Sequence, residues 1–288
     1  MGHTPKLLLG LVTHPGSHFN SDGEATERIM ELGARIQDLG LNVETLISDR
    51  NEFDTDDQKI RMAQPFNSAW AQVKAEKAWA KYLMASRGSR KIDPSHGRPF
   101  YLGMFLKRAF SFLVSSRHLK RLANIDLSHL RVLKEGMASK ADWILVVEDD
   151  GKAGSAQLVA EKISALIAAL DDKEVDIFVN LSESIDHSEL GVQEILARAK
   201  ESFILSDGTK VVQVTPPISN TVCANLYSRR FAIRFAEAIE SQGILPSIPI
   251  DWRLNRVILD SVGNDIKSVW VIPGFFIQGS MHDNWQEL

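Results

Sequence analysis

Apolar runs typical of buried strands alternate along this chain with segments of helical spacing. The clearest run is Trp-Ile-Leu-Val-Val at residues 143–147. An uninterrupted apolar run of this length predicts a strand that is buried on both faces of a parallel sheet. Further strands are expected at residues 7–12, 41–48, 177–181, 211–214, 221–227 and 269–272.

Amphipathic helices are expected between these strands. After the first strand, four apolar residues lie three or four positions apart and share one helical face: Ile29, Leu32, Ile36 and Leu39. Ser21 and Glu24 have the spacing of a capping box at the start of this helix, and Gly40 marks its end. Similar patterns predict helices around residues 127–137 and 158–170. The alternation predicts an α/β protein with a Rossmann-like, mostly parallel central sheet flanked by helices in a single large domain, residues 1–288.

The composition is that of an ordinary globular protein. With 288 residues, 44% of them apolar, the chain is long enough to bury a substantial core. Its lone cysteine, Cys223, excludes an internal disulfide framework. The apolar run at residues 7–12 is too short for a signal peptide or a membrane span. We therefore expect a cytoplasmic protein.

Positive charge is concentrated in the middle of the chain. The net charge is −4, yet residues 98–134 carry +7 and the remainder −11. That segment contains one acidic residue, Asp126, and eight basic residues: Arg98, Lys107, Arg108, Arg117, Lys120, Arg121, Arg131 and Lys134. Such asymmetry indicates an anionic partner, which is a nucleotide diphosphate, a phospholipid surface or nucleic acid. The pI near 6.1 disfavours nucleic acid, and we expect none.

The same segment is rich in aromatic residues: Phe100, Tyr101, Phe105, Phe110 and Phe112. Two interpretations stay open. One is an interfacial helix beside anionic lipid, which makes the protein peripheral at the inner face of the membrane. The other, which composition favours, is a helix that buries its aromatic rings in the core and leaves Lys and Arg in water. We expect residues 55–115 to form a helical aromatic and basic insert.

Three consecutive acids, Glu148, Asp149 and Asp150, directly follow the strand at residues 143–147. The carboxyl ends of strands are where open α/β sheets bind their ligands. Three adjacent carboxylates repel one another, and a hard divalent cation such as Mn²⁺ or Mg²⁺ neutralises them. The alternative is that the acids favour the positive end of the helix that follows.

Four motifs occur in a characteristic order: Ser128-His129-Leu130, then Glu148-Asp149-Asp150, then residues 220–230 followed by Pro249-Ile250-Asp251, then Pro273 with Gln278-Gly279-Ser280. In order and approximate spacing they resemble glycosyltransferase family twenty-five, which includes lipooligosaccharide and collagen galactosyltransferases. The resemblance runs from about residue 121 to the C-terminus. Asn220 stands where that family usually has Gly, and residues 55–115 have no counterpart in it.

The resemblance implies a GT-A fold with a DXD-like acidic motif. Residues 1–150 would form the half that binds the nucleotide sugar, and residues 151–288 the half that binds the acceptor. The implied reaction is the metal-dependent transfer of a hexose from a UDP-sugar to a glycan or glycolipid, with inversion. A divalent ion there bridges the two donor phosphates and stabilises the leaving charge.

The residues suggest roles in such a site. Alternation along an extended backbone places Glu148 and Asp150 on the same side as metal ligands, and turns Asp149 away toward the ribose or the sugar. His282 is a candidate third metal ligand, or else a surface residue near the chain end. Asp251 is the candidate general base that takes the proton of the acceptor hydroxyl, or else the N-cap of a following helix.

Donor contacts are expected from loops at the same edge of the sheet. Six residues are candidates, and each is equally compatible with an ordinary turn or surface position: Thr13, His14, Asp49, Arg50, Arg121 and Asn124. Two other functions stay open. One is a non-catalytic protein of the same fold that binds a sugar nucleotide or a glycan. The other is a nucleotidyltransferase, although the loop at residues 14–17 has neither the Arg nor the Lys that such enzymes usually place there.

Overall fold

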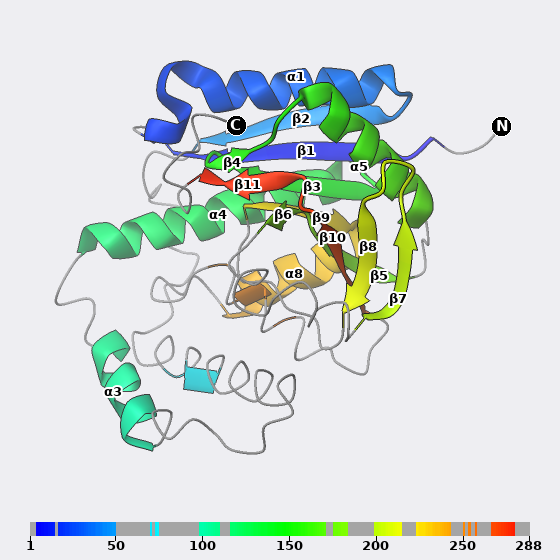
Figure 1. Ribbon diagram of the computed structural model, residues 1–288. Coiled ribbons are helices and arrows are strands. Elements are labelled where there is room, and N and C mark those ends of the chain that lie inside the picture. Colours follow the sequence, from blue (N-terminus) through cyan, green and yellow to red (C-terminus); the bar gives the residue numbers. More distant parts are fainter. Residues whose placement is uncertain are drawn as a thin grey trace.

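The computed structural model describes residues 4–14, 17–49, 70, 73–74, 98–109, 116–170, 175–183, 199–214, 223–242, 250, 253–254, 257 and 266–279. Within these ranges the protein is α/β, with a large mixed sheet and helices on both of its faces (Figure 1). In the part of the chain that the structure describes, no helix is long and apolar enough to cross a membrane.

The described residues form an eight-stranded sheet in the order β2-β1-β3-β9-β5-β10-β8-β7. Its strands are β1 (Lys6–Thr13), β2 (Asn42–Asp49), β3 (Trp143–Glu148), β5 (Asp176–Asn180), β7 (Ala199–Ile204), β8 (Lys210–Val214), β9 (Ala224–Ser228) and β10 (Ile266–Ile272). A second sheet, in the order β4-β11-β6, contains β4 (Gly151–Lys152), β6 (Ser182–Glu183) and β11 (Phe276–Gln278). The helices are η1 (His18–Gly23), α1 (Glu24–Asp38), α3 (Arg98–Ala109), α4 (Ser116–Ala138), α5 (Ala156–Leu170) and α8 (Arg229–Gln242).

The predicted strands are all present, within a few residues of their expected ends. β2, β1 and β3 pair in parallel, and so do β5 and β10. β9 lies between β3 and β5 and is antiparallel to both. β8 and β7 complete one edge with antiparallel pairings. The sheet is therefore mixed, with a larger antiparallel share than the sequence suggested.

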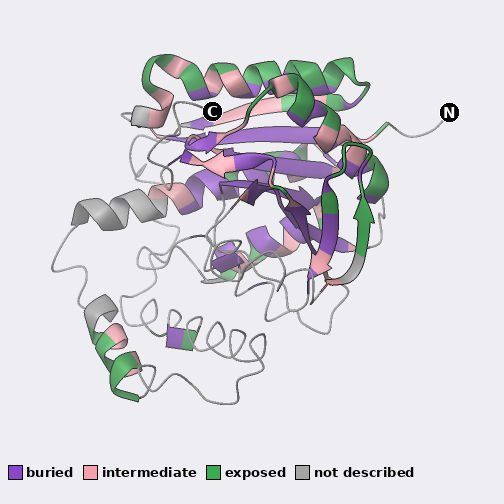
Figure 2. Cartoon of the chain, viewed as in Figure 1, coloured by how far each residue is buried: buried purple, intermediate pink, exposed green. Residues whose placement is uncertain are grey.

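β3 lies at the centre of two hydrophobic cores. Trp143, Leu145 and Val147 belong to the core under α1 and α5, whereas Ile144 and Val146 belong to the core under α4 and α8. All five side chains are buried, as Figure 2 shows for the central strands. The prediction of a strand buried on both faces is confirmed, because helices cover the sheet on both sides.

α1 buries the expected face but begins and ends differently from the prediction. Its N-cap is Gly23, at φ +84° and without a side-chain cap hydrogen bond, so the predicted capping box of Ser21 and Glu24 is wrong. Ser21 lies inside the preceding η1 turn, with an extended backbone. Leu39 is the C-cap and is exposed, because the chain has already left the helix. Gly40 adopts φ +93°, which confirms its predicted role.

α3 bears on the two interpretations of the basic aromatic segment. Phe100, Leu102 and Leu106 are exposed, whereas Tyr101 and Phe105 are half-buried. Phe110 and Phe112 lie outside the described residues. The expectation that this helix buries its aromatic rings in the core is therefore wrong for Phe100, which is exposed, while Tyr101 and Phe105 are only half-buried.

A matched pair of helical glycines tests how tightly α4 packs on the sheet. We expect Gly136→Ala to lower the free energy of unfolding by about 1–3 kcal/mol, because its Cβ would overlap the side chain of Ile144 in β3. Gly103→Ala in α3 meets nothing within 4 Å. It should gain up to about 1 kcal/mol from helix propensity. Urea unfolding of both variants checks this, and equal effects would contradict the close contact.

Candidate functional site

The order of the strands reverses between β1 and β3. From β1 the chain moves outward to β2, and it then returns through α4 to add β3 on the other side of β1. α1 and α4 cover opposite faces of the sheet. Open α/β sheets bind ligands at the carboxyl ends of strands at such a reversal. The acids that follow β3 lie at this position.

Asp149 is fixed between the ends of these two strands. Thr13, the last residue of β1, donates a hydrogen bond from Oγ1 to Oδ2 of Asp149 over 2.7 Å. The backbone N–H of Asp149 donates to the carbonyl of Val12 over 3.0 Å. Thr13 is buried, whereas Asp149 is only partly buried. The structure thus brings together two of the residues predicted to contact the donor.

Glu148 pairs with the histidine of the Ser-His motif. Its Oε1 lies 3.0 Å from Nε2 of His129 in α4, with exposed side-chain fractions of 19% for Glu148 and 1% for His129. His129 is therefore held in the core and orients a carboxylate that still reaches the surface. The carbonyl of Ser128 accepts a hydrogen bond from the hydroxyl of Ser48. Two motifs that lie apart in the sequence meet at the end of β3.

Asp150 occupies a tight turn that leads into β4. β3 ends at Glu148, so the alternation expected to place Asp150 on the same side as Glu148 does not continue to it. Asp150 is buried, and its carbonyl accepts a hydrogen bond from the N–H of Gly279 over 2.7 Å. A Cβ at Gly151 would lie 2.9 Å from the carbonyl oxygen of Glu148, so this turn needs glycine.

Cys223 lies buried close to these acids. Burial raises the pKa of its thiol, and the negative charges of Asp150 and Glu148 raise this pKa further. The thiol therefore stays protonated near neutral pH, which makes it a poor nucleophile. Burial and the charge of Glu148 also raise the pKa of the Tyr227 hydroxyl, whereas a hydrogen bond with Asn225 lowers it.

Two cations beside the acids were not predicted from the sequence. Arg28 of α1 donates from Nη2 to the carbonyl of Asp149 over 3.2 Å. Burial lowers the pKa of Arg28, although the charges of Glu24 and Asp149 oppose this. Burial and the nearby charge of Arg28 lower the pKa of Lys152 in β4. The sequence held one indication of the role of Arg28. It lies three residues after Ala25, on the side of α1 that faces the core.

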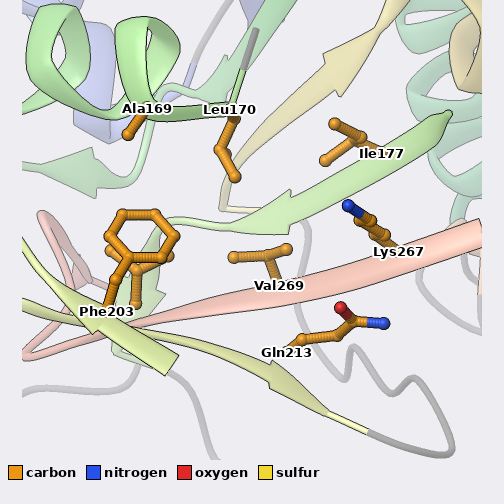
Figure 3. Close-up of a pocket in the computed structure, with 8 residues that line it drawn as sticks. Ala169, Leu170, Ile177, Phe203, Gln213, Lys267 and Val269 are labelled. Carbon is orange, nitrogen blue, oxygen red and sulfur yellow. The ribbon is translucent and has the colours of Figure 1, made fainter. Parts of the chain in front are cut away.

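A small hollow of about 80 Å³ lies beside the acids, between α1 and α5. Arg28, Glu148 and Gly151 line it together with apolar side chains. A larger hollow of about 220 Å³ lies near the amino ends of β5 and β10, where Ile177 and Lys267 face it (Figure 3). Because that hollow is at the opposite edge from the strand reversal, we assign the candidate site to the acids.

The other predicted site residues are placed as follows. His14 follows β1 and is half-buried, and Asn124 is half-buried in α4. The backbone of Asp49 pairs with Thr13 at the end of β2, which places it at the same edge. Three predicted residues lie outside the described residues: Arg50, Asp251 and His282. For two more, Asp49 and Arg121, the structure describes the backbone but not the side chain.

No family model matches the sequence, and a search of curated proteins finds no match. Within the described ranges, no three His, Cys, Asp or Glu side chains form a ready metal cage.

Proposed function

We propose that this protein is a metal-dependent glycosyltransferase of the GT-A fold, similar to family twenty-five, that transfers a hexose from a UDP-sugar to a glycan or glycolipid acceptor. The observation that carries the proposal is the run of three acids at the strand reversal. Each acid is held differently: Glu148 by His129, Asp149 by Thr13, and Asp150 within a buried turn. Acids that served only to favour the positive end of the following helix would not need separate partners of this kind.

The donor chemistry fits the groups present. Carboxylate oxygens suit Mn²⁺ or Mg²⁺, and Glu148 and Asp150, with His282, are the residues that would hold the ion. When bound, such an ion neutralises the charge that grows on the departing diphosphate. Arg28 adds positive charge on the α1 side of the acids, and Lys152 lies near Arg28. Asp149, fixed by Thr13, presents its remaining oxygen to a ribose or sugar hydroxyl.

The acceptor chemistry needs a base, for which we propose Asp251. It would remove the proton of an acceptor hydroxyl while that oxygen bonds to the anomeric carbon and the bond from this carbon to the diphosphate breaks, which inverts the configuration.

A described contact supports this assignment. Two residues after Asp251, the guanidinium of Arg253 forms a buried ion pair with Asp126 of α4. Asp126 lies three residues before His129, about one helical turn away. This contact attaches Arg253, two positions after Asp251 in the sequence, to α4 one turn from the His129–Glu148 pair.

Calorimetry with UDP tests the proposal. We expect UDP to bind at least about tenfold more tightly with Mn²⁺ than without it, since the ion links the acids to the diphosphate. UDP-hexoses should then be turned over to UDP, faster when a glycan acceptor is present. Failure of UDP to bind under either condition contradicts the proposal. Binding without turnover identifies a non-catalytic binding protein, and release of pyrophosphate from a nucleoside triphosphate identifies a nucleotidyltransferase.

A further inference from the structure

The outer face of α3 is apolar and exposed. Leu102 and Leu106, one helical turn apart on this face, are 59% and 45% exposed. Phe100, 37% exposed, lies on another side of α3, with its ring against that of Tyr101. Trp70, 52% exposed, contacts α3 through its ring, whose centroid lies 6.3 Å from that of Phe105. Of the nine large apolar side chains that are exposed in the described residues, these four gather on or against one helix. Figure 2 shows α3 as an exposed element.

Both faces of α3 carry apolar residues. Tyr101, Met104 and Phe105 form the half-buried inner face, while Leu102 and Leu106 lie on the exposed one. A helix that is apolar all round is normally buried. The outer face of α3 is therefore a surface that a partner is expected to cover.

The sequence around this face contains several basic residues and no acidic ones. Between residues 98 and 125 there is no Asp or Glu. The same stretch contains six basic residues: Arg98, Lys107, Arg108, Arg117, Lys120 and Arg121. Exposed Leu, Phe and Trp with flanking Lys and Arg are the composition of helices that lie in the interface of an anionic bilayer. This stretch therefore carries +6 and the rest of the chain −10, which makes it the part of the sequence best matched in charge to such a surface.

α4 places α3 at the same edge of the sheet as the acids. Gly136, near the end of α4, packs on Ile144 near the start of β3, whereas His129 meets Glu148 at the end of β3. α4 therefore runs antiparallel to β3, and its first residue, Ser116, lies about 20 Å beyond His129 along the helix. Figure 1 shows α4 extending past the carboxyl ends of the strands, with α3 beyond it.

We propose that the outer face of α3, together with Trp70, is a docking surface for an anionic phospholipid bilayer. Leu102 and Leu106 insert at the level of the headgroups, and the positive net charge of the surrounding sequence favours lipid phosphates. Docking through α3 turns the acid-bearing edge of the sheet toward the bilayer. This geometry suits an acceptor whose sugar is carried on a lipid.

Vesicle sedimentation of the full chain tests the proposal without any nucleotide sugar, so its result is separate from that of the transfer reaction. We expect the protein to bind vesicles in which about one lipid in three is phosphatidylglycerol and to ignore pure phosphatidylcholine. Replacing Leu102 and Leu106 together by Gln, which keeps helix propensity, should weaken binding about tenfold or more. Raising the salt concentration should weaken binding by the wild type as well.

A matched control uses two apolar residues that are equally exposed on other helices. Met30 of α1 is 53% exposed and Leu158 of α5 is 48% exposed. Changing both to Gln should leave vesicle binding unchanged, with circular dichroism confirming that each variant is folded. The proposal is overturned if the wild type stays in the supernatant with both vesicle types, if the control pair loses as much binding, or if neutral vesicles bind equally well. It is also overturned if the wild type is a dimer that the Leu102 and Leu106 variant separates, because a second copy then covers this face.

Discussion

Replacing Asp150 by asparagine is expected to lower the Mn²⁺-dependent release of UDP from a UDP-hexose by at least about a thousandfold. Asparagine keeps the shape of the side chain, so the buried turn and the hydrogen bond from Gly279 to the carbonyl at position 150 should persist. The negative charge that would hold the cation is lost. Without metal the variant should melt within a few degrees of the wild type, because removing one of three adjacent like charges also reduces their mutual repulsion.

Melting temperatures give this prediction a readout besides activity. A ligand that binds only the folded state stabilises it. Mn²⁺ with UDP should therefore raise the melting temperature of the wild type and leave that of Asp150→Asn nearly unchanged. If the variant keeps both its turnover and its Mn²⁺-dependent shift, Asp150 is not a metal ligand.

Asp207 offers a matched control at the other edge of the sheet. Its carboxylate accepts hydrogen bonds from the N–H of Thr209 over 3.0 Å and from its hydroxyl over 2.8 Å, and forms an ion pair with Lys162. Asp207→Asn should lose some stability through these contacts and keep full turnover. Loss of turnover in both variants would indicate a general effect of removing a carboxylate.

The main sheet was predictable because its strands are long enough to show a pattern. Residues 143–147 are apolar without interruption, and the structure buries them on both faces between two helix layers. The strands of the small sheet are two or three residues long, so periodicity cannot reveal them. They form because the chain continues past the carboxyl ends of β3, β5 and β10 and pairs there. That pairing depends on the tertiary arrangement and not on local sequence.

The candidate site was predictable in place but not in its contacts. A strand end with three acids locates the site, yet the partner of Glu148 is His129, from a helix earlier in the chain. Nothing local indicates that Arg28 reaches the carbonyl of Asp149, 121 residues away. The capping-box prediction failed for a similar reason: Gly23, in a left-handed conformation, starts α1 after a short turn that the spacing alone does not show.

The buried ion pair of Asp126 and Arg253 should give the largest change in stability. The two side chains are 1% and 2% exposed, and Nη2 of Arg253 also donates to the carbonyl of Ile239 over 3.1 Å. Asp126→Asn removes the negative charge that faces the buried guanidinium, which costs about 3–5 kcal/mol. At about 2–4 °C per kcal/mol for a chain of this size, the melting temperature should fall by roughly 6–20 °C.

An exposed ion pair that also involves α4 provides the comparison. Lys134 of α4 pairs with Glu240 of α8, and the two side chains are 50% and 47% exposed. Lys134→Gln should cost less than about 1 kcal/mol, because water screens exposed pairs. Equal losses for Asp126→Asn and Lys134→Gln, measured by urea unfolding, would show that the buried charge is not the source of the effect.

The double variant Asp126→Leu with Arg253→Met separates charge burial from the placement of Asp251. Since neither charge remains, most of the lost stability should return. The anchor between α4 and the segment that carries Asp251 is then apolar and no longer directional. We expect turnover of the UDP-hexose to stay reduced about tenfold or more even though the protein is stable, because a small misplacement of a catalytic group is costly. Full recovery of turnover along with stability would show that the ion pair has no part in positioning the base.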